Sequence, residues 1–238
     1  MKRVMAALQW DAQLQYRYGL YIAGAFALTF WLVFVTLLNA DWRLPMVPSF
    51  LLLNVTINTF YFVAALILFE KAENVLEGLV VTPLRSWEYL ISKVVTLTAL
   101  SFVENMIITL FAVGLAFNVG WLALGFVFMA MQFTLFGVVA VARYREINSF
   151  LLPSGAWMIA LSLPPLVGLN LAPKALFWLL PTMGPFVLMQ EAVLPVAWSD
   201  GEVWLAIGMS AVWLVVAMVW AYRSFERHIV RNEGRKAG

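Results

Sequence analysis

The sequence predicts an all-α membrane protein that crosses the lipid bilayer six times. Of its 238 residues, 63% are hydrophobic and only 12% are charged, whereas about a quarter of the residues in a soluble domain are charged. The mean hydropathy is +0.89, and the apolar runs each approach the ~20 residues that cross ~30 Å of hydrocarbon. These observations exclude an ordinary soluble domain and predict a single transmembrane domain over residues 1–238.

Residues 1–18 predict a helix that lies along the membrane surface, with Trp10 and Tyr16 near headgroup level. Asp11 and Gln15 interrupt the apolar side of this helix. That side consists of Val4, Met5, Leu8 and Ala12. A frayed polar terminus is the alternative interpretation of the same residues.

Six apolar runs follow this segment and are the predicted spans. If the N-terminus is cytoplasmic, 13 of the 15 lysines and arginines fall on the cytoplasmic side, and only Arg43 and Lys174 fall outside. This asymmetry follows the positive-inside rule, so we expect both termini in the cytoplasm. The spans are residues 19–38, 49–69, 89–117, 121–142, 150–169 and 203–222.

Residues 70–88, between the second and third spans, form the longest polar stretch between two apolar runs. Their first half predicts a short amphipathic helix with Glu70, Glu73 and Glu77 on its polar side. Pro83 ends that helix because proline lacks an N–H group. Ser86 is a candidate cap for the next helix. We therefore expect a short cytoplasmic helix held between two long spans.

Residues 170–202 differ from an ordinary polar loop because they are apolar and interrupted by prolines. Pro173, Pro181, Pro185 and Pro195 separate apolar runs that are too short to span, and Gly184 adds a bend. This pattern predicts a re-entrant pair of short helices that enters from the outer face. A loop that rests on the membrane is the alternative.

Residues 223–238 form a basic cytoplasmic tail. Its arginines recur at i, i+4 spacing and would make one stripe on a helix, which favours contact with anionic headgroups. They are Arg223, Arg227, Arg231 and Arg235.

Glu104 is the outstanding polar residue within a span. It lies eleven positions after Lys93, about 16 Å along a helix axis and thus near the bilayer centre, where a charge costs at least ~3 kcal/mol. Glu104 either lines a substrate path or anchors helices through Asn54 or Asn58 of the second span. Ser101 and Asn105 belong to the same group of path candidates.

The sequence carries none of three common motifs of enzyme active sites. No phosphate-binding Gly-x-x-x-x-Gly-Lys-Ser/Thr loop, Gly-x-Ser-x-Gly motif or His-Glu-x-x-His motif occurs. The chain has no cysteine and one histidine, which excludes a thiolate metal site and a histidine-based cluster or triad within one chain. We expect no catalytic residues, no metal and no cofactor in this chain, and no nucleic-acid partner.

The stretch between the second and third spans resembles a motif of the ABC-2 type permeases, the membrane subunits of one class of ABC exporters. That motif reads approximately E-(K/R)-E-x-G-T-L-E-x-L-x-V-T-P-L-x-x-x-E-x-x-x-x-K. Here Asn74 and Val75 stand where Gly-Thr is usual. Within the family, the N-terminal residues are similar to those of bacterial fluoroquinolone-export permeases, which implies a location in the bacterial plasma (inner) membrane. The matching positions are Glu70, Glu73, Leu76, Glu77, Leu79, Val81, Thr82, Pro83, Leu84, Glu88 and Lys93.

The resemblance implies a permease dimer, either homodimer or heterodimer, docked on two separate ATP-binding subunits that bind ATP and Mg. The cytoplasmic helix would couple to these subunits, and the dimer would export a hydrophobic or amphiphilic small molecule, such as a drug or lipid, by alternating access. The coupling residues implied are Glu70, Glu73, Glu77, Thr82, Pro83 and Arg85.

Three alternatives stay open from the sequence. A haem-export permease is a neighbouring member of the same class. A secondary transporter would use Glu104 as its proton-carrying group. A membrane scaffold would bind partners without transporting anything.

Overall fold

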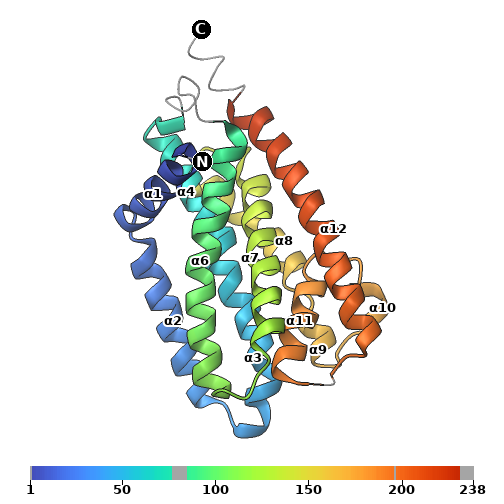
Figure 1. Cartoon of the computed structure of the whole chain (residues 1–238). Coiled ribbons are helices and arrows are strands. Elements are labelled where there is room, and N and C mark those ends of the chain that lie inside the picture. The colour runs from blue at the N-terminus through green and yellow to red at the C-terminus, as the bar shows by residue number, and fades with distance from the viewer. Residues whose placement is uncertain (1, 77–84, 196, 231–238) are drawn as a thin grey trace.

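The computed structural model describes residues 2–76, 85–195 and 197–230, and within these ranges every regular element is a helix (Figure 1). Six helical segments in the described residues are long and apolar enough to cross a membrane, which confirms the predicted all-α fold with six spans. The elements are α1 (Lys2–Arg17), α2 (Leu20–Leu37), α3 (Ala40–Val55), the π-helix η1 (Thr56–Tyr61), α4 (Phe62–Ala72), α6 (Ser86–Val113), α7 (Val119–Val141), α8 (Ile147–Leu161), α9 (Pro165–Gly168), α10 (Lys174–Phe177), α11 (Met183–Val193), α12 (Asp200–Phe225) and the π-helix η2 (Glu226–Val230).

The second span consists of α3, η1 and α4 and begins earlier than the sequence predicts. Its helix starts at Ala40 rather than residue 49 and includes Pro45 and Pro48. Each proline removes one backbone hydrogen bond, but the helix continues through both. The predicted span began only after them, at residue 49. The π-turn η1 in the middle of the span contains Asn58. Such turns shift the register of the side chains that follow.

The connection between the third and fourth spans is also displaced from its predicted position. Helix α6 ends before Gly114, which has a φ of 71°, a positive value that glycine adopts easily because it has no Cβ atom. Asn118 then caps α7, and its side chain accepts hydrogen bonds from the N–H groups of Gly120 and Trp121. The tight turn expected at residues 118–120 is therefore the first turn of a helix.

The fifth span is interrupted. Helix α8 ends at Leu161, and α9 resumes after Pro164. Beyond it, α11 begins at Met183, so Gly184 and Pro185 lie in its first turn instead of stopping a helix as predicted. A proline is tolerated there because the first N–H groups of a helix have no partner within the helix.

Helix α7 is the centre of the bundle. It contacts α6, α11, α12, η1 and α4, and Figure 1 shows it between α6 and α12. On α7, Gln132 donates a hydrogen bond of 3.0 Å to the backbone oxygen of Ser210 on α12. Helix α11 is buried along almost its whole length against α7, α12 and α3. Protein therefore covers its backbone, as the predicted re-entrant segment requires, although its depth in a membrane stays a prediction.

Helix α1 crosses the end of the bundle where α12 finishes (Figure 1) and packs mainly on α6. Its buried face differs from the predicted one. Asp11, Leu14 and Gln15 are buried, whereas Met5 is exposed. Gln15 donates a 2.8 Å hydrogen bond to Thr96 of α6, so the polar residues that appeared to interrupt the apolar side make the contact with the bundle.

The last span continues past its predicted end. Helix α12 begins after Ser199, whose hydroxyl caps it by accepting from the N–H of Glu202. At its other end the π-turn η2 follows directly. The first two arginines of the predicted stripe, Arg223 and Arg227, line one hollow beside Glu226. Arg231 and Arg235 lie outside the described residues.

Candidate functional site

The predicted cytoplasmic helix is broken near its beginning. Helix α4 ends at Ala72, the chain turns at Glu73, and Asn74 adopts a left-handed conformation with a φ of 57°. Helical residues Val75 and Leu76 follow. The prediction of one helix from residue 70 is therefore wrong in this detail. Asparagine tolerates the left-handed region better than most residues, which explains how it can occupy a position where glycine is usual in the resembling motif.

Three charged side chains meet in the interior just before this turn. Lys93 of α6 donates hydrogen bonds of 2.9 Å to Asp11 of α1 and 2.7 Å to Glu70 of α4. The side chains of all three are at most 3% exposed. One lysine thus bridges two carboxylates, and the three charges join three helices.

Two hydroxyl groups complete this arrangement. Tyr89 donates a hydrogen bond to Glu70, and Ser92 donates one to Asp11. The ammonium group of Lys93 also lies 4.5 Å from the centroid of the Tyr89 ring, a cation–π geometry. These hydroxyls give the carboxylates further donors, which a buried charge requires. We call Asp11, Glu70, Tyr89, Ser92 and Lys93 the junction cluster.

The surface beside the junction cluster carries a second, exposed link to α1. Arg17 pairs with Glu73 at 2.8 Å, and both side chains are partly exposed. Tyr18 packs its ring against Phe69 at 4.8 Å between centroids. Burial, reinforced by the nearby Glu73 carboxylate, raises the pKa of the Tyr18 hydroxyl to about 12. Tyr18 therefore stays neutral at physiological pH.

Lys71 connects α4 to the end of the central helix. Its ammonium group donates to the backbone oxygens of Ala142 at 2.9 Å and Tyr144 at 2.6 Å, and it lies 3.4 Å from that of Val141. These carbonyls belong to the end of α7, where backbone acceptors lack helical partners and the dipole favours a cation. Lys71 thus caps α7 from another helix.

On the far side of residues 77–84, the start of α6 is also tied down. Glu88 accepts a 2.9 Å hydrogen bond from the backbone N–H of Arg85. Arg85 rather than the predicted Ser86 is the N-cap residue. Ser86 instead donates a hydrogen bond to Glu226 of η2. The segment between the second and third spans therefore has fixed ends on both sides.

The predicted coupling residues differ in how far they are exposed in the structure. Glu70 is buried within the junction cluster, so it does not face a partner as expected, because Lys93 and Tyr89 occupy its carboxylate. Glu73 and Arg85 are exposed. Glu77, Thr82 and Pro83 lie outside the described residues, and their role stays a prediction.

A second polar group lies midway along the spans. Glu104 of α6 is 5% exposed and accepts a hydrogen bond from the side-chain amide of Asn58 in η1. On its other side, Gly24 of α2 approaches so closely that a Cβ atom there would overlap the Glu104 carboxylate. Glu104 thus sits where α2, η1 and α6 meet, and the predicted contact with Asn58 is present.

The remaining path candidates also lie in the interior. Asn54 is fully buried, and neither polar atom of its side chain has a hydrogen-bond partner among the described residues. Asn105 donates to the backbone oxygen of Ser101 at 2.7 Å and to its hydroxyl at 3.1 Å. The cluster is therefore a helix contact in this conformation, and several of its acceptors are unused.

Sequence analysis did not predict that Asp11 pairs with Lys93 or that Lys71 caps the end of α7. For Asp11 a signal existed, because a charge on the apolar side of an amphipathic helix has to find a partner when that side packs. Lys71 lies within the polar stretch of residues 70–88, and Lys93 lies near the start of the predicted third span, so neither residue looked unusual. The helix packing alone identifies their partners.

The fold and the two polar sites define a multi-pass membrane permease. One polar site pairs buried charges at the α1 end of the bundle, and the other holds Glu104 where three spans meet.

The chain belongs to the Fluoroquinolones export permease protein family, whose model matches residues 2–233. It is 27% identical over 239 aligned residues to two curated relatives from two strains of Mycobacterium tuberculosis, each described as a fluoroquinolones export permease protein. Each alignment covers 98% of this chain and 99% of the relative. The family match confirms the predicted resemblance to drug-export permeases, and the chain is a transport protein of the membrane.

Proposed function

We propose that this chain is the membrane subunit of an ATP-driven ABC-2 type exporter, worked by a separate ATP-binding subunit at the segment between α4 and α6. In this scheme two copies of the permease, or this chain and a sister permease, dock on two ATP-binding subunits. ATP and Mg bind in those subunits, and both termini of the permease face them from the cytoplasm.

One observation carries this proposal: the residues that flank 77–84 are bonded to three other parts of the bundle. Glu73 and the junction cluster hold α1, and Lys71 holds the end of α7. Ser86 holds η2 at the end of α12. Each link is a direct ion pair or hydrogen bond. A force on the segment between α4 and α6 would therefore reach α1, α7 and α12 as well as the second and third spans.

The substrate proposed is an amphiphilic drug-like molecule, with fluoroquinolones first because the curated relatives carry that name. Glu104 supports a path near the bilayer centre, since its partner Asn58 and the buried Asn54 retain unused polar atoms. A basic group on the substrate would pair with this carboxylate when the spans separate. Alternating access would then open the contact between α2, η1 and α6.

The test is transport in inverted membrane vesicles that contain this chain and its ATP-binding partner. We expect Mg-ATP to drive uptake of a fluorescent fluoroquinolone. The charge reversal Glu73→Lys/Glu77→Lys should abolish this uptake while the protein remains inserted. Glu146→Lys is the matched control, because Glu146 is an exposed acidic residue in the turn between α7 and α8, and it should transport normally.

A charge-swap variant separates partner contact from internal pairing. Arg17→Glu/Glu73→Arg keeps the ion pair of Arg17 and Glu73 but exchanges its charges. Normal transport by this variant and by the double reversal would contradict the coupling role. Uptake driven by a pH gradient without nucleotide would instead identify a secondary transporter, and partner binding without any uptake would identify a scaffold.

A further inference from the structure

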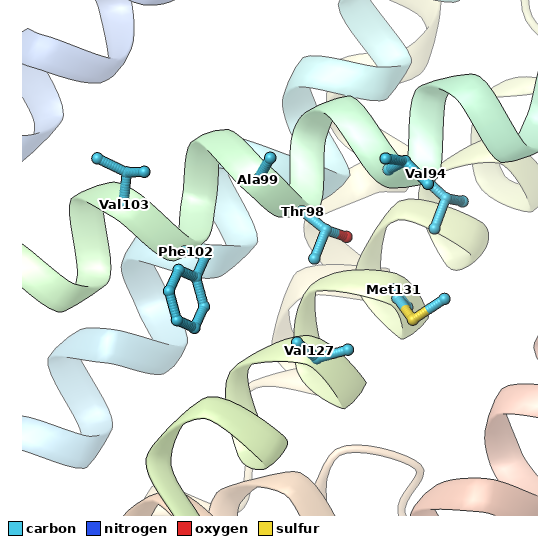
Figure 2. Close-up of a pocket in the computed structure, with 8 residues that line it drawn as sticks. Val94, Thr98, Ala99, Phe102, Val103, Val127 and Met131 are labelled. Carbon is cyan, nitrogen blue, oxygen red and sulfur yellow. The ribbon is translucent and has the colours of Figure 1, made fainter. Parts of the chain in front are cut away.

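An open apolar groove runs along the outer surface of α6 and α7. Its wider part has a volume of about 550 Å³ and lies between these two helices. In Figure 2, Thr98 and Phe102 extend from α6 toward Val127 and Met131 of α7. Thr98 contributes the one hydroxyl among the residues lining this part. The walls thus match a hydrocarbon chain rather than a polar ligand.

The groove continues toward the end of the bundle that holds α1. A narrower part of about 120 Å³ shares Val94, Val95 and Met131 with the wider one and extends to Trp87 and Tyr222. From Trp87 to Val103, α6 rises about 24 Å, which exceeds half of the ~30 Å hydrocarbon layer. Trp87 and Tyr222 are 42% and 43% exposed, as aromatic residues at a membrane interface are.

A cationic hollow adjoins the groove at Tyr222. It has a volume of about 460 Å³ and is lined by Tyr222, Arg223, Glu226 and Arg227. Both arginines are exposed, and neither has an ion pair with any residue in the described part of the chain. The carboxylate of Glu226 accepts from Ser86. The two guanidinium groups, which have no ion pair among the described residues, therefore stand beside one occupied carboxylate. Arginine binds phosphate oxygens in a bidentate manner.

We propose that this groove and hollow form a binding site for one anionic phospholipid of the leaflet at the α1 end. An acyl chain lies between α6 and α7, the glycerol region meets Trp87 and Tyr222, and the phosphate binds Arg223 and Arg227. Charge complementarity decides the occupant. An apolar groove that ends in two arginines without an ion pair in the described part of the chain matches an apolar chain with an anionic head. The site is independent of the transported molecule. Its head region touches Glu226, the residue that holds the start of α6.

Native mass spectrometry of the purified full-length chain tests this site, with equal amounts of phosphatidylglycerol and phosphatidylcholine as probes. We expect one phosphatidylglycerol per chain to be retained in preference. The change Arg223→Ala/Arg227→Ala should lower retention roughly thirtyfold, because each of the two cations near an anionic lipid contributes about one kcal/mol. Arg143→Ala is the matched control at the same end of the bundle and should retain the lipid.

The groove is tested separately from the arginines. Ala99→Trp fills it from α6 and should also abolish retention, whereas Ala25→Trp, at an exposed alanine of α2, should not. Equal retention of both lipids by the unaltered chain, or full retention by Ala99→Trp, would overturn the proposal. A dimer that retains no lipid and dissociates on Ala99→Trp would assign the groove to a second copy and would overturn it as well.

Discussion

At the scale of single residues, the position of Glu104 depends on the absence of a side chain opposite. Gly24 lets α2 approach the carboxylate, and Asn58 donates to it from the π-turn. A carboxylate near the bilayer centre needs such partners because lipid offers none. The small residue and the amide are therefore as important to this contact as the acid itself.

Gly24→Ala tests this contact directly. The added Cβ would overlap the Glu104 carboxylate, and such overpacking typically costs about 1–3 kcal/mol. We expect a lower melting temperature in detergent and reduced drug transport. Gly208→Ala is the matched control, because a Cβ there meets no atom within 4 Å, and alanine favours a helix over glycine by up to ~1 kcal/mol. Equal melting temperatures for the two variants would show that the contact with Glu104 is not tight.

At the scale of helices, buried charges rather than apolar packing alone fix α1 against the bundle. Lys93 joins α6 to both α1 and α4, and Lys71 joins α4 to α7. A buried ion pair is not necessarily more stable than an apolar contact of the same size. It is specific, because a shifted helix would leave a charge without a partner.

Lys93→Met should therefore destabilise the protein strongly. It leaves Asp11 and Glu70 as neighbouring buried acids, and loss of one partner from a buried pair costs about 3–5 kcal/mol. Thermal unfolding in detergent measures this loss. The triple variant Lys93→Met/Asp11→Asn/Glu70→Gln removes all three charges and should recover much of the stability.

The exposed pair of Lys174 and Glu202 provides the control. Its atoms are 3.4 Å apart, and the two side chains are 48% and 29% exposed. Such pairs contribute ~0–1 kcal/mol, so Lys174→Met should change the melting temperature little. If Lys93→Met unfolds no earlier than Lys174→Met, the junction cluster does not hold these helices together.

At the scale of the whole molecule, the two ends of the bundle differ in charge. Helix α1, Lys71, Arg223 of α12 and Arg227 of η2 lie at one end. Arg43 and Lys174 lie toward the other, near the starts of α3 and α12 (Figure 1). Six spans bring α1 and the end of α12 to the same face. The positive-inside rule predicts that this face is cytoplasmic.

Cysteine labelling tests this orientation cleanly, because the natural chain has no cysteine. We expect a membrane-impermeant maleimide to label Leu171→Cys in intact spheroplasts, since Leu171 is 71% exposed beyond the fifth span. Arg143→Cys, in the turn after α7, should react only after the membrane is permeabilised. The reverse pattern would invert the topology and remove the proposed coupling segment from the cytoplasm.

The sequence by itself determined the class of fold, the number of spans and the family. Each span must be apolar over a length set by the bilayer, so the fold class and the number of spans can be read along the chain without knowing which helices touch. The resemblance to the family rests on a contiguous motif, which is also read along the chain. Helix ends were less certain: Gly114 stopped α6 early, and Pro45 and Pro48 did not stop α3.

The tertiary structure alone decided which polar residues work together. Asp11 and Lys93 are 82 positions apart, and Asn58 and Glu104 are 46 apart. Their pairing depends on which helix faces meet, and in η1 a π-turn also changes the direction of the side chains. Local sequence shows that a buried charge needs a partner. Packing in three dimensions determines which residue that partner is.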